Sequence, residues 1–396
     1  MLAPFSPRRD ARHGGSRAIA QLLLGLSQRH RLGVVYLRGS QEPPLDAELA
    51  GRCELVREVP HQHPRGWRRR VRQLRNTLAP LAGTPSWVAW WAVPQYAEAV
   101  RAALASWHPD VVHAHFHLMG QYLPALGGAA APIVLVQHDP GVGAAAVYRG
   151  WLDPRRVLAP FERHAWRRYE AAVMRAVEAV VVFTERDRAL VASLAGATPV
   201  VTIPLGTELP AQPLDPIGAA PATLLFVGNF GHAPNLDAAR RLAHGILPRV
   251  RARTPAVRLS LVGADGGHAI RRLAGKHIDL AESVENVVPY LDRAAVVVLP
   301  LRLGGGMRVK TLEALAAGKA VVASRVAVDG LAVTDGDQCC LADTDEEFAS
   351  RIGELLADDT RRRALAQRAR AWAIEHLGWE PVTAAYESLH RGLLAP

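Results

Sequence analysis

The chain has 396 residues, 49% of them hydrophobic, so it is too long for one ordinary core and predicts two domains of about 150 to 200 residues each. Its net charge of +10 and pI near 10.1 favour an anionic partner such as a nucleotide, a phospholipid or a nucleic acid. Three cysteines without metal-ligand spacing (Cys53, Cys339 and Cys340) argue against a zinc site and indicate a reducing cytoplasm, and the lack of eighteen consecutive apolar residues argues against a membrane-spanning helix.

The N-terminal stretch predicts the end of a β-strand over residues 2–7, a polar loop to Gly14 and Gly15, a helix over 16–28 and a strand over 33–37. The opening strand looks clipped. Either it is unusually short or the true start codon lies further upstream. Two adjacent glycines by themselves indicate a turn.

Residues 64–80 predict a basic amphipathic helix. Its apolar residues recur at helical spacing and its other positions are crowded with arginine; the apolar set is Trp67, Val71, Leu74 and Leu78. Three tryptophans follow, at 87, 90 and 91, and indole rings favour the wet edge of an apolar phase. Two interpretations stay open, an anionic membrane surface over residues 64–91 or a helix that packs its apolar stripe on the domain. Nucleic acid is not expected, because no recognised nucleic-acid-binding pattern accompanies the charge.

Two buried strands are predicted at residues 110–115 and 132–136, each ending in a polar loop where open α/β sheets bind ligands. His138 follows the second strand. Three histidines at 113, 115 and 117 alternate with other residues; without a carboxylate at ligand spacing, a structural or acceptor-side role is favoured over a metal site. A helix over 155–174, a strand over 178–184 and a helix from Glu185 complete this half, and the Pro- and Ala-rich residues 209–222 indicate a linker.

The second half opens with a strand at 223–227, followed by Gly228, Asn229 and a helix from Pro234 or Asn235, and a further strand is predicted at 257–263. A buried strand at 294–300 then leads into a glycine-rich basic loop, a helix over 307–317 and a strand over 320–323. Helices are predicted over residues 343–358 and 360–375, with a terminal segment after them.

The glycine-rich loop predicts an anion site. Gly304, Gly305 and Gly306 allow close approach of a ligand, and the helix that follows would present unpaired amides. Arg308 and Lys310 add two positive charges, and Glu313, further along the helix, is placed to accept hydrogen bonds from hydroxyls such as those of a ribose. The plainer alternative is a strand-to-helix turn with a solvated Glu313.

Glu313 with the following ALAAGKAVVAS resembles the donor-site signature of family-4 retaining glycosyltransferases, and GGGMRVK resembles a glycine-rich Arg-x-Lys version of it. QHDPG around His138 and VTIPLGTE at 201–208 also match segments of this family. Two positions depart from its common pattern. Gly305 stands where a glutamate usually touches the sugar, and Asn229 stands where an arginine usually holds the diphosphate.

The resemblance implies an α/β fold of two Rossmann-like domains facing across a cleft, the GT-B arrangement. It implies an acceptor domain at 1–208, a linker at 209–222, a nucleotide-sugar domain at 223–375 and a C-terminal helix at 376–396 that returns to the first domain. The implied reaction moves a sugar, with retention and without metal or cofactor, from a nucleotide-diphosphate donor to a glycan, lipid-linked or other hydroxyl acceptor, in cell-envelope or polysaccharide biosynthesis. The expected location is the cytoplasm, peripheral on the inner face of the membrane if residues 64–91 bind it.

The implied site comprises two sets of residues. His138, Arg308, Lys310 and Glu313 would act at the sugar, diphosphate and ribose, and the donor would be bound by Gly14, Gly15, Gly228, Asn229, Gly304, Gly305, Gly306, Met307 and Val309. A degenerate homologue that binds nucleotide sugar or membrane without turnover is the alternative, supported by Gly305 and Asn229. An NAD-dependent oxidoreductase is disfavoured because no GxGxxG with a following acidic residue is present.

Overall fold

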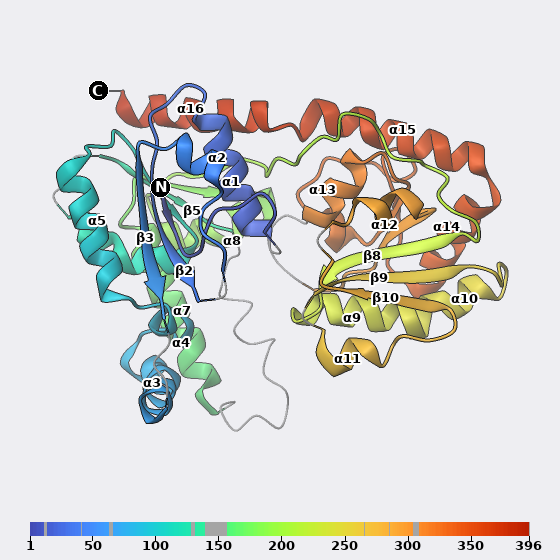
Figure 1. Cartoon of the computed structure of the whole chain (residues 1–396), viewed down its shortest axis with the longest axis horizontal. Helices are drawn as coiled ribbons and strands as arrows, with labels where there is room; N and C mark the ends of the chain where they lie inside the picture. Colours follow the sequence, from blue (N-terminus) through green and yellow to red (C-terminus); the bar gives the residue numbers. More distant parts are fainter. Residues whose placement is uncertain are drawn as a thin grey trace. The chain divides into compact units, whose positions relative to one another are not determined.

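A computed structural model describes residues 1–11, 14–40, 42–62, 66–127, 131–138, 157–264, 266–284, 286–303 and 309–395. The chain divides into two compact units, one formed by Met1–Pro204 with Thr383–Pro396 and the other by Leu205–Val382 (Figure 1). Each unit is built on its own parallel sheet, which confirms the predicted α/β class with two Rossmann-like domains. The predicted linker at 209–222 belongs to the second unit in this division, and the predicted domain limits themselves stay predictions.

The first unit contains a seven-stranded sheet in the order β3-β2-β1-β4-β5-β6-β7, with every neighbouring pair parallel. Its strands are β1 (Leu2–Ala3), β2 (Gly33–Gly39), β3 (Leu55–His61), β4 (Val112–His115), β5 (Ile133–Val136), β6 (Ala179–Val182) and β7 (Val200–Thr202). Strands β4 and β6 are buried along their whole length, as parallel strands covered on both faces should be.

Helices connect and cover these strands. They are α1 (Gly14–Leu26), α2 (Ala47–Gly51), α3 (Trp67–Leu78), α4 (Ser86–Trp90), α5 (Pro94–Ser106), α7 (Ala159–Met174), α8 (Glu185–Ala195) and α16 (Trp379–Leu394), with 3-10 segments η1 (Ala79–Ala82) and η2 (His117–Leu126). From Thr383 onward α16 belongs to the first unit, although it follows the second unit in the sequence.

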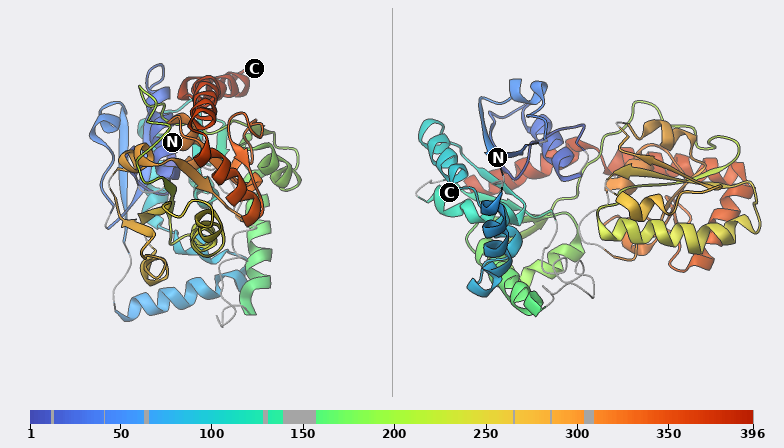
Figure 2. Two further views of the ribbon diagram at one scale, coloured as in Figure 1. Left: turned by 90° about the vertical axis from the view of Figure 1, so that its right-hand side faces the viewer. Right: turned by 60° about the horizontal axis from the view of Figure 1, so that its bottom comes forward.

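The second unit contains a six-stranded parallel sheet in the order β10-β9-β8-β11-β12-β13, with helices on both faces (Figure 2). Its strands are β8 (Thr223–Asn229), β9 (Arg258–Ala264), β10 (Ile278–Glu282), β11 (Val296–Leu299), β12 (Val321–Ala323) and β13 (Cys340–Leu341). Its helices are α9 (Ala233–Arg241), the π-helical turn η4 (Leu242–Ile246), α10 (Leu247–Arg251), α11 (Gly267–Arg271), α12 (Val288–Arg293), α13 (Val309–Ala316), the 3-10 turn η5 (Arg325–Val328), α14 (Asp345–Ala357) and α15 (Asp359–His376).

The strands that the sequence does not predict are β3, β10 and β13. All three lie at sheet edges: β3 mixes buried with exposed residues, β10 has no buried residue, and β13 has only two residues, so none gives a continuous apolar run. One correction concerns α1. Gly14 and Gly15, expected in a loop, form its first turn, and the helix ends at Leu26 instead of Gln28.

Candidate functional site

In each sheet the strand order reverses at one point, and the loops at the carboxyl ends of the strands beside it are where open α/β sheets bind ligands. The reversal lies between β1 and β4 in the first unit and between β8 and β11 in the second. The predicted site residues end these strands or their neighbours, as Gly228 and Asn229 end β8, or come after them in the sequence. Each unit therefore has its own candidate site.

In the first unit the structure brings Gly15, Phe116 and His138 together. Phe116 directly follows β4, and a Cβ added at Gly15 would lie 2.6 Å from its Cζ, so only glycine leaves room for the ring. The Phe116 ring in turn stacks on His138, with ring centroids 3.9 Å apart and planes 7° from parallel. Phe116 thus joins two predicted site residues that lie 123 positions apart in the sequence (138 − 15).

His138 is also held by two further side chains. Its Nε2 lies 3.2 Å from Nδ1 of His115 in β4, and its ring meets the edge of Phe183, just beyond β6, at a centroid distance of 4.9 Å. His115 is buried, and desolvation, reinforced by the neighbouring histidines, holds its pKa well below the usual value. His115 is therefore neutral at neutral pH.

A second pair of histidines links β4 to α16. Nε2 of His113 lies 2.7 Å from Nε2 of His390, so one nitrogen donates and the other accepts. His390 lies near His30, and His30 Nε2 is 3.0 Å from a carboxylate oxygen of Glu387 on α16. His113 and His115 therefore contact other histidines, which the sequence pattern does not reveal because the partners lie 277 and 23 positions away, respectively.

In the second unit two glycines bring the ends of β8 and β9 close together. Gly228 is paired with Gly263, and a Cβ on Gly263 would lie 1.7 Å from the Gly228 carbonyl oxygen. Asn229 then organises the turn into α9, since its Oδ1 accepts from the Gly231 amide at 2.8 Å and its carbonyl accepts from Asn235 Nδ2 at 2.7 Å. Asn229 thus shapes the polypeptide here, where the common family pattern has a cation.

Lys310 lies in the first turn of α13 and reaches the first turn of α9. Its Nζ donates to Oδ1 of Asn235 and lies 4.9 Å from the centroid of the Phe226 ring in β8. Two helix N-termini and an ammonium group therefore meet beside the end of β8, an arrangement that favours negative charge. Glu313 is half-buried on α13, three residues after Lys310 and so on the same side of the helix.

The other predicted residues of this loop, Gly304, Gly305, Gly306, Met307 and Arg308, lie outside the residues that the structure describes. Val309 is the first residue of α13.

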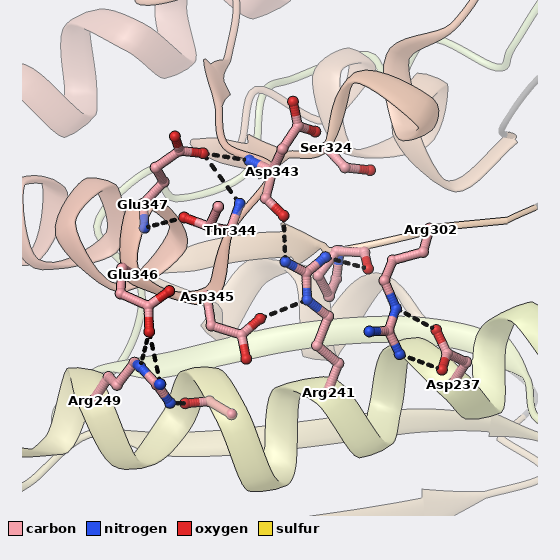
Figure 3. Close-up of polar contacts among 12 residues, drawn as sticks. Asp237, Arg241, Arg249, Arg302, Ser324, Asp343, Thr344, Asp345, Glu346 and Glu347 are labelled. Carbon is pink, nitrogen blue, oxygen red and sulfur yellow. Dashed lines mark hydrogen bonds and ion pairs between the residues drawn. The ribbon is translucent and has the colours of Figure 1, made fainter.

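A network of hydrogen bonds and ion pairs holds the chain on the N-terminal side of this loop (Figure 3). The buried Arg241 of α9 donates to the carbonyl of Pro300 at 3.2 Å and pairs with Asp345 at 2.6 Å. Arg302 makes a bidentate ion pair with Asp237, which also lies on α9. These contacts tie the end of β11 to α9, and so fix where the chain leaves the sheet toward residue 304. The sequence does not reveal these contacts, because Arg302 and Asp237 are 65 positions apart.

A third feature is the outer surface of α3. Trp67 is 70% exposed and Leu74 61% exposed, and Val71 and Leu78 are exposed as well. The inward side instead carries polar residues, namely the buried Asn76 and the half-buried Arg72, which donates to the Trp90 carbonyl at 2.9 Å. The interpretation that the apolar stripe packs on the domain is therefore wrong. Of the three nearby tryptophans, Trp87 is exposed, whereas Trp90 and Trp91 are half-buried.

Within the described residues, no helix is both long enough and apolar enough to cross a membrane.

Comparison with known families gives matches in both halves. Residues 12–209 match the family described as Glycosyltransferase Family 4, and residues 221–358 match the one described as Glycosyl transferases group 1.

Three similar curated proteins differ in the share of the chain that they match. A GDP-mannose-dependent alpha-(1-6)-phosphatidylinositol monomannoside mannosyltransferase of Mycolicibacterium smegmatis is 30% identical over 151 residues, 34% of this chain and 39% of that protein. A D-inositol 3-phosphate glycosyltransferase of Acidothermus cellulolyticus is 28% identical over 334 residues, 76% of this chain and 70% of that protein. A phosphatidyl-myo-inositol mannosyltransferase of M. smegmatis is matched over 43% of its length, so the chain spans less than half of the two M. smegmatis relatives.

Solved structures show the same fold. A sucrose-phosphate synthase from Thermosynechococcus elongatus aligns over 99% of this chain and 98% of its own, with a TM-score of 0.71 and 20% identity. The Anabaena HepE protein in complex with UDP-glucose aligns over 98% of this chain and 99% of its own, with a TM-score of 0.65 and 14% identity. At these identities the likeness concerns the fold alone, and it confirms the predicted GT-B class.

Proposed function

Because the chain belongs to glycosyltransferase family 4, we propose that it transfers a sugar from a nucleotide-diphosphate donor to a hydroxyl acceptor with retention of configuration. The observation that carries this proposal is the convergence of Lys310 and the N-termini of α9 and α13 beside the end of β8. The UDP-glucose bound by the Anabaena protein supports a donor of this chemical class.

In the second unit the proposed task is to bind the donor and stabilise its leaving group. Arg308, Lys310 and the helix-end amides would balance the negative charge that grows on the diphosphate as the bond to the anomeric carbon breaks, without a metal or cofactor. Glu313 would accept hydrogen bonds from the ribose hydroxyls. Gly228 and Asn229, with Val309 and the loop residues 304–307, would let the backbone approach the donor closely.

In the first unit we propose that His138 lies at the transferred sugar and that Gly14 and Gly15 face the donor phosphates. The acceptor oxygen would bond to the anomeric carbon on the face that the diphosphate leaves, through a short-lived oxocarbenium ion. The hydroxyl proton would pass to the departing diphosphate. This route needs no covalent nucleophile in the protein.

The proposed acceptor is a glycan, a lipid-linked sugar or another hydroxyl compound of the cell envelope. The outward apolar stripe of α3, flanked by exposed Arg69, Arg70 and Arg75, supports docking to an anionic lipid surface. We place the protein in the cytoplasm, bound peripherally to the inner face of the membrane through α3.

The experiment that tests the proposed reaction has two stages. A thermal-shift panel with UDP-glucose, GDP-mannose and other nucleotide sugars identifies the donor, since a ligand that binds the folded state raises the melting temperature in proportion to its affinity. The stabilising donor is then incubated with mixed glycan and lipid acceptors, and release of nucleoside diphosphate is measured. Release that depends on the acceptor supports glycosyl transfer.

A second candidate, binding of nucleotide sugar without turnover, is favoured by Gly305 and by the structural use of Asn229 in a turn. Stabilisation by a nucleotide sugar with no release of nucleoside diphosphate over days would establish it. No stabilisation by any nucleotide sugar would contradict both candidates.

A further inference from the structure

Phe116 has a backbone conformation that a bulky residue rarely adopts. Its φ is 67° and its ψ is 145°, and only Ser283 shares a positive φ among the described residues other than glycine. This combination lies next to a region that is populated almost only by glycine, and such strain persists where the surroundings impose it. Phe116 is also the residue at which the chain leaves β4 on the side of the candidate site.

The surroundings of Phe116 show what imposes this conformation. Its amide donates to the Val136 carbonyl at 2.8 Å, which extends the β4–β5 pairing by one residue. Its ring meets the Phe5 ring edge-on at 5.2 Å, fits against Gly15 and stacks on His138. The strained backbone thus directs an aromatic face toward His138, where an ordinary extended residue would direct its side chain elsewhere.

His115 restrains the same histidine through a ring nitrogen. It is 1% exposed, and its Nε2 has no hydrogen-bond partner in the part of the chain that the structure describes, whereas its Nδ1 lies 3.2 Å from His138 Nε2. A buried N–H without an acceptor costs more than an unused lone pair. His115 is therefore most stable with its proton on Nδ1, which makes His138 Nε2 the acceptor and leaves the proton of a neutral His138 on Nδ1.

We propose that Phe116 and His115 are positioning residues that hold His138 in one ring orientation and in the Nδ1-protonated tautomer. Phe116 stacks on the His138 ring and fixes its plane, and Phe183 packs against the same ring in a T-shaped contact. His115 determines which nitrogen of His138 carries the proton. The inference rests on the proposed placement of His138 at the transferred sugar. A group held in this way needs no reorientation before reaction, so its displacement by a fraction of an ångström lowers turnover more than binding.

The strain at Phe116 is tested with two variants of the full chain, Phe116→Gly and Phe116→Ala. Both variants remove the ring, but only glycine adopts the positive φ of this position without strain. At ordinary extended positions alanine gives the more stable protein, whereas here we expect the higher melting temperature for Phe116→Gly. A higher melting temperature for Phe116→Ala overturns the claim that Phe116 is strained.

The tautomer is tested by nitrogen NMR of the full chain labelled with ¹⁵N-histidine at neutral pH, with the His138 signals assigned from their loss in His138→Gln. We expect a protonated Nδ1 and an unprotonated Nε2. His115→Leu and Phe116→Gly should each give a mixture of tautomers, and His115→Asn, whose amide reproduces the Nδ1 donor, should restore the wild-type pattern. His164→Gln, on the exposed side of α7, is the control and should change nothing. An Nε2-protonated His138 in the wild type, or unchanged signals in His115→Leu and Phe116→Gly, overturns the proposal.

A kinetic measurement separates this inference from the function on which it rests. With UDP-glucose or GDP-mannose as donor, Phe116→Gly and His115→Leu should lower kcat by about 10- to 100-fold with little change in KM for the donor. Wild-type turnover in His138→Gln refutes the placement of His138 at the sugar. Lost turnover in His138→Gln with wild-type turnover in the other two variants refutes the positioning role alone.

Discussion

Gly15 lies in the first turn of α1, a position where replacement of glycine by alanine usually stabilises a helix by about 1 kcal/mol. Here the added methyl group would lie 2.6 Å from Phe116 Cζ, and the Phe116 ring cannot retreat because it stacks on His138. We expect Gly15→Ala to lower the free energy of unfolding by about 1 to 3 kcal/mol, measured by urea denaturation. Gly51→Ala is the matched control, since a Cβ at this end of α2 meets nothing within 4 Å. Equal effects of the two substitutions would show that the contact is not tight.

Lys310 is the cationic residue of the proposed donor site that lies within the described part of the chain. Its charge-assisted hydrogen bonds to a diphosphate should contribute about 1.5 to 3 kcal/mol to binding. We therefore expect Lys310→Ala to weaken binding of UDP or GDP, whichever the wild type binds more tightly, by about 10- to 100-fold in isothermal titration calorimetry. Lys276→Ala removes an exposed lysine elsewhere in the second unit and should leave the affinity unchanged. If both variants bind alike, Lys310 does not contact the diphosphate.

At the scale of single elements, α3 carries its apolar side outward. If α3 enters an anionic lipid surface, each buried leucine contributes about 1.5 to 3 kcal/mol to binding. Leu74→Ala should therefore reduce binding to vesicles that contain phosphatidylserine by about tenfold or more, as measured by flotation. Leu190→Ala is a matched control, because Leu190 is also an exposed helical leucine, 54% exposed on α8. Wild-type protein that stays unbound at low salt would end the membrane hypothesis.

The buried histidine pair between β4 and α16 should make the stability of the protein depend on pH. Burial, with a contribution from His30, lowers the pKa of His390 to about 4, and burial also places the pKa of His113 well below its ordinary value. Both are neutral in the folded state and take up protons on unfolding once the pH falls below about 6.5, so they reduce stability progressively between about pH 6.5 and 4. Glu387 on α16 opposes this trend at His390, and His390 adds to it at His113.

We expect urea denaturation to show a smaller loss of stability from pH 7 to pH 5 in His390→Gln than in the wild type. His164→Gln, which removes an exposed histidine, should keep the wild-type slope. Equal slopes in all three proteins would contradict a neutral His113–His390 pair.

At the scale of the whole molecule, residues 383–396 complete the first unit although they follow the second in the sequence. Thr383 packs against Gly25, and His390 contacts His113 in the middle of the sheet. Deletion after Val382 should therefore destabilise the first unit alone. In limited proteolysis followed by mass spectrometry we expect cleavage within residues 1–204 to accelerate by about tenfold or more, while residues 205–382 keep their resistance. Equal acceleration in both units would contradict this division.

Local sequence patterns were enough to locate the central strands of both sheets and to indicate the family. The sequence predicts strands β5, β6, β8, β11 and β12 within a few residues, because a strand buried on both faces needs a mainly apolar run. It also predicts β4 and β9, although these include polar residues such as His113 and Ser260. The family resemblance followed from short contiguous segments, such as the one that begins at Glu313. Local patterns of this kind do not depend on how the chain is folded back on itself.

Which side chains meet, and which side of a helix faces inward, depends on how the whole chain folds. The pairing of His115 with His138, of His113 with His390 and of Lys310 with Asn235 joins residues separated by 23, 277 and 75 positions. The periodicity of α3 defines an apolar stripe but not its direction, which depends on what the neighbouring α4 and η1 leave uncovered. The strain at Phe116 arises because strand pairing fixes its backbone while its ring packs between loops from distant parts of the sequence.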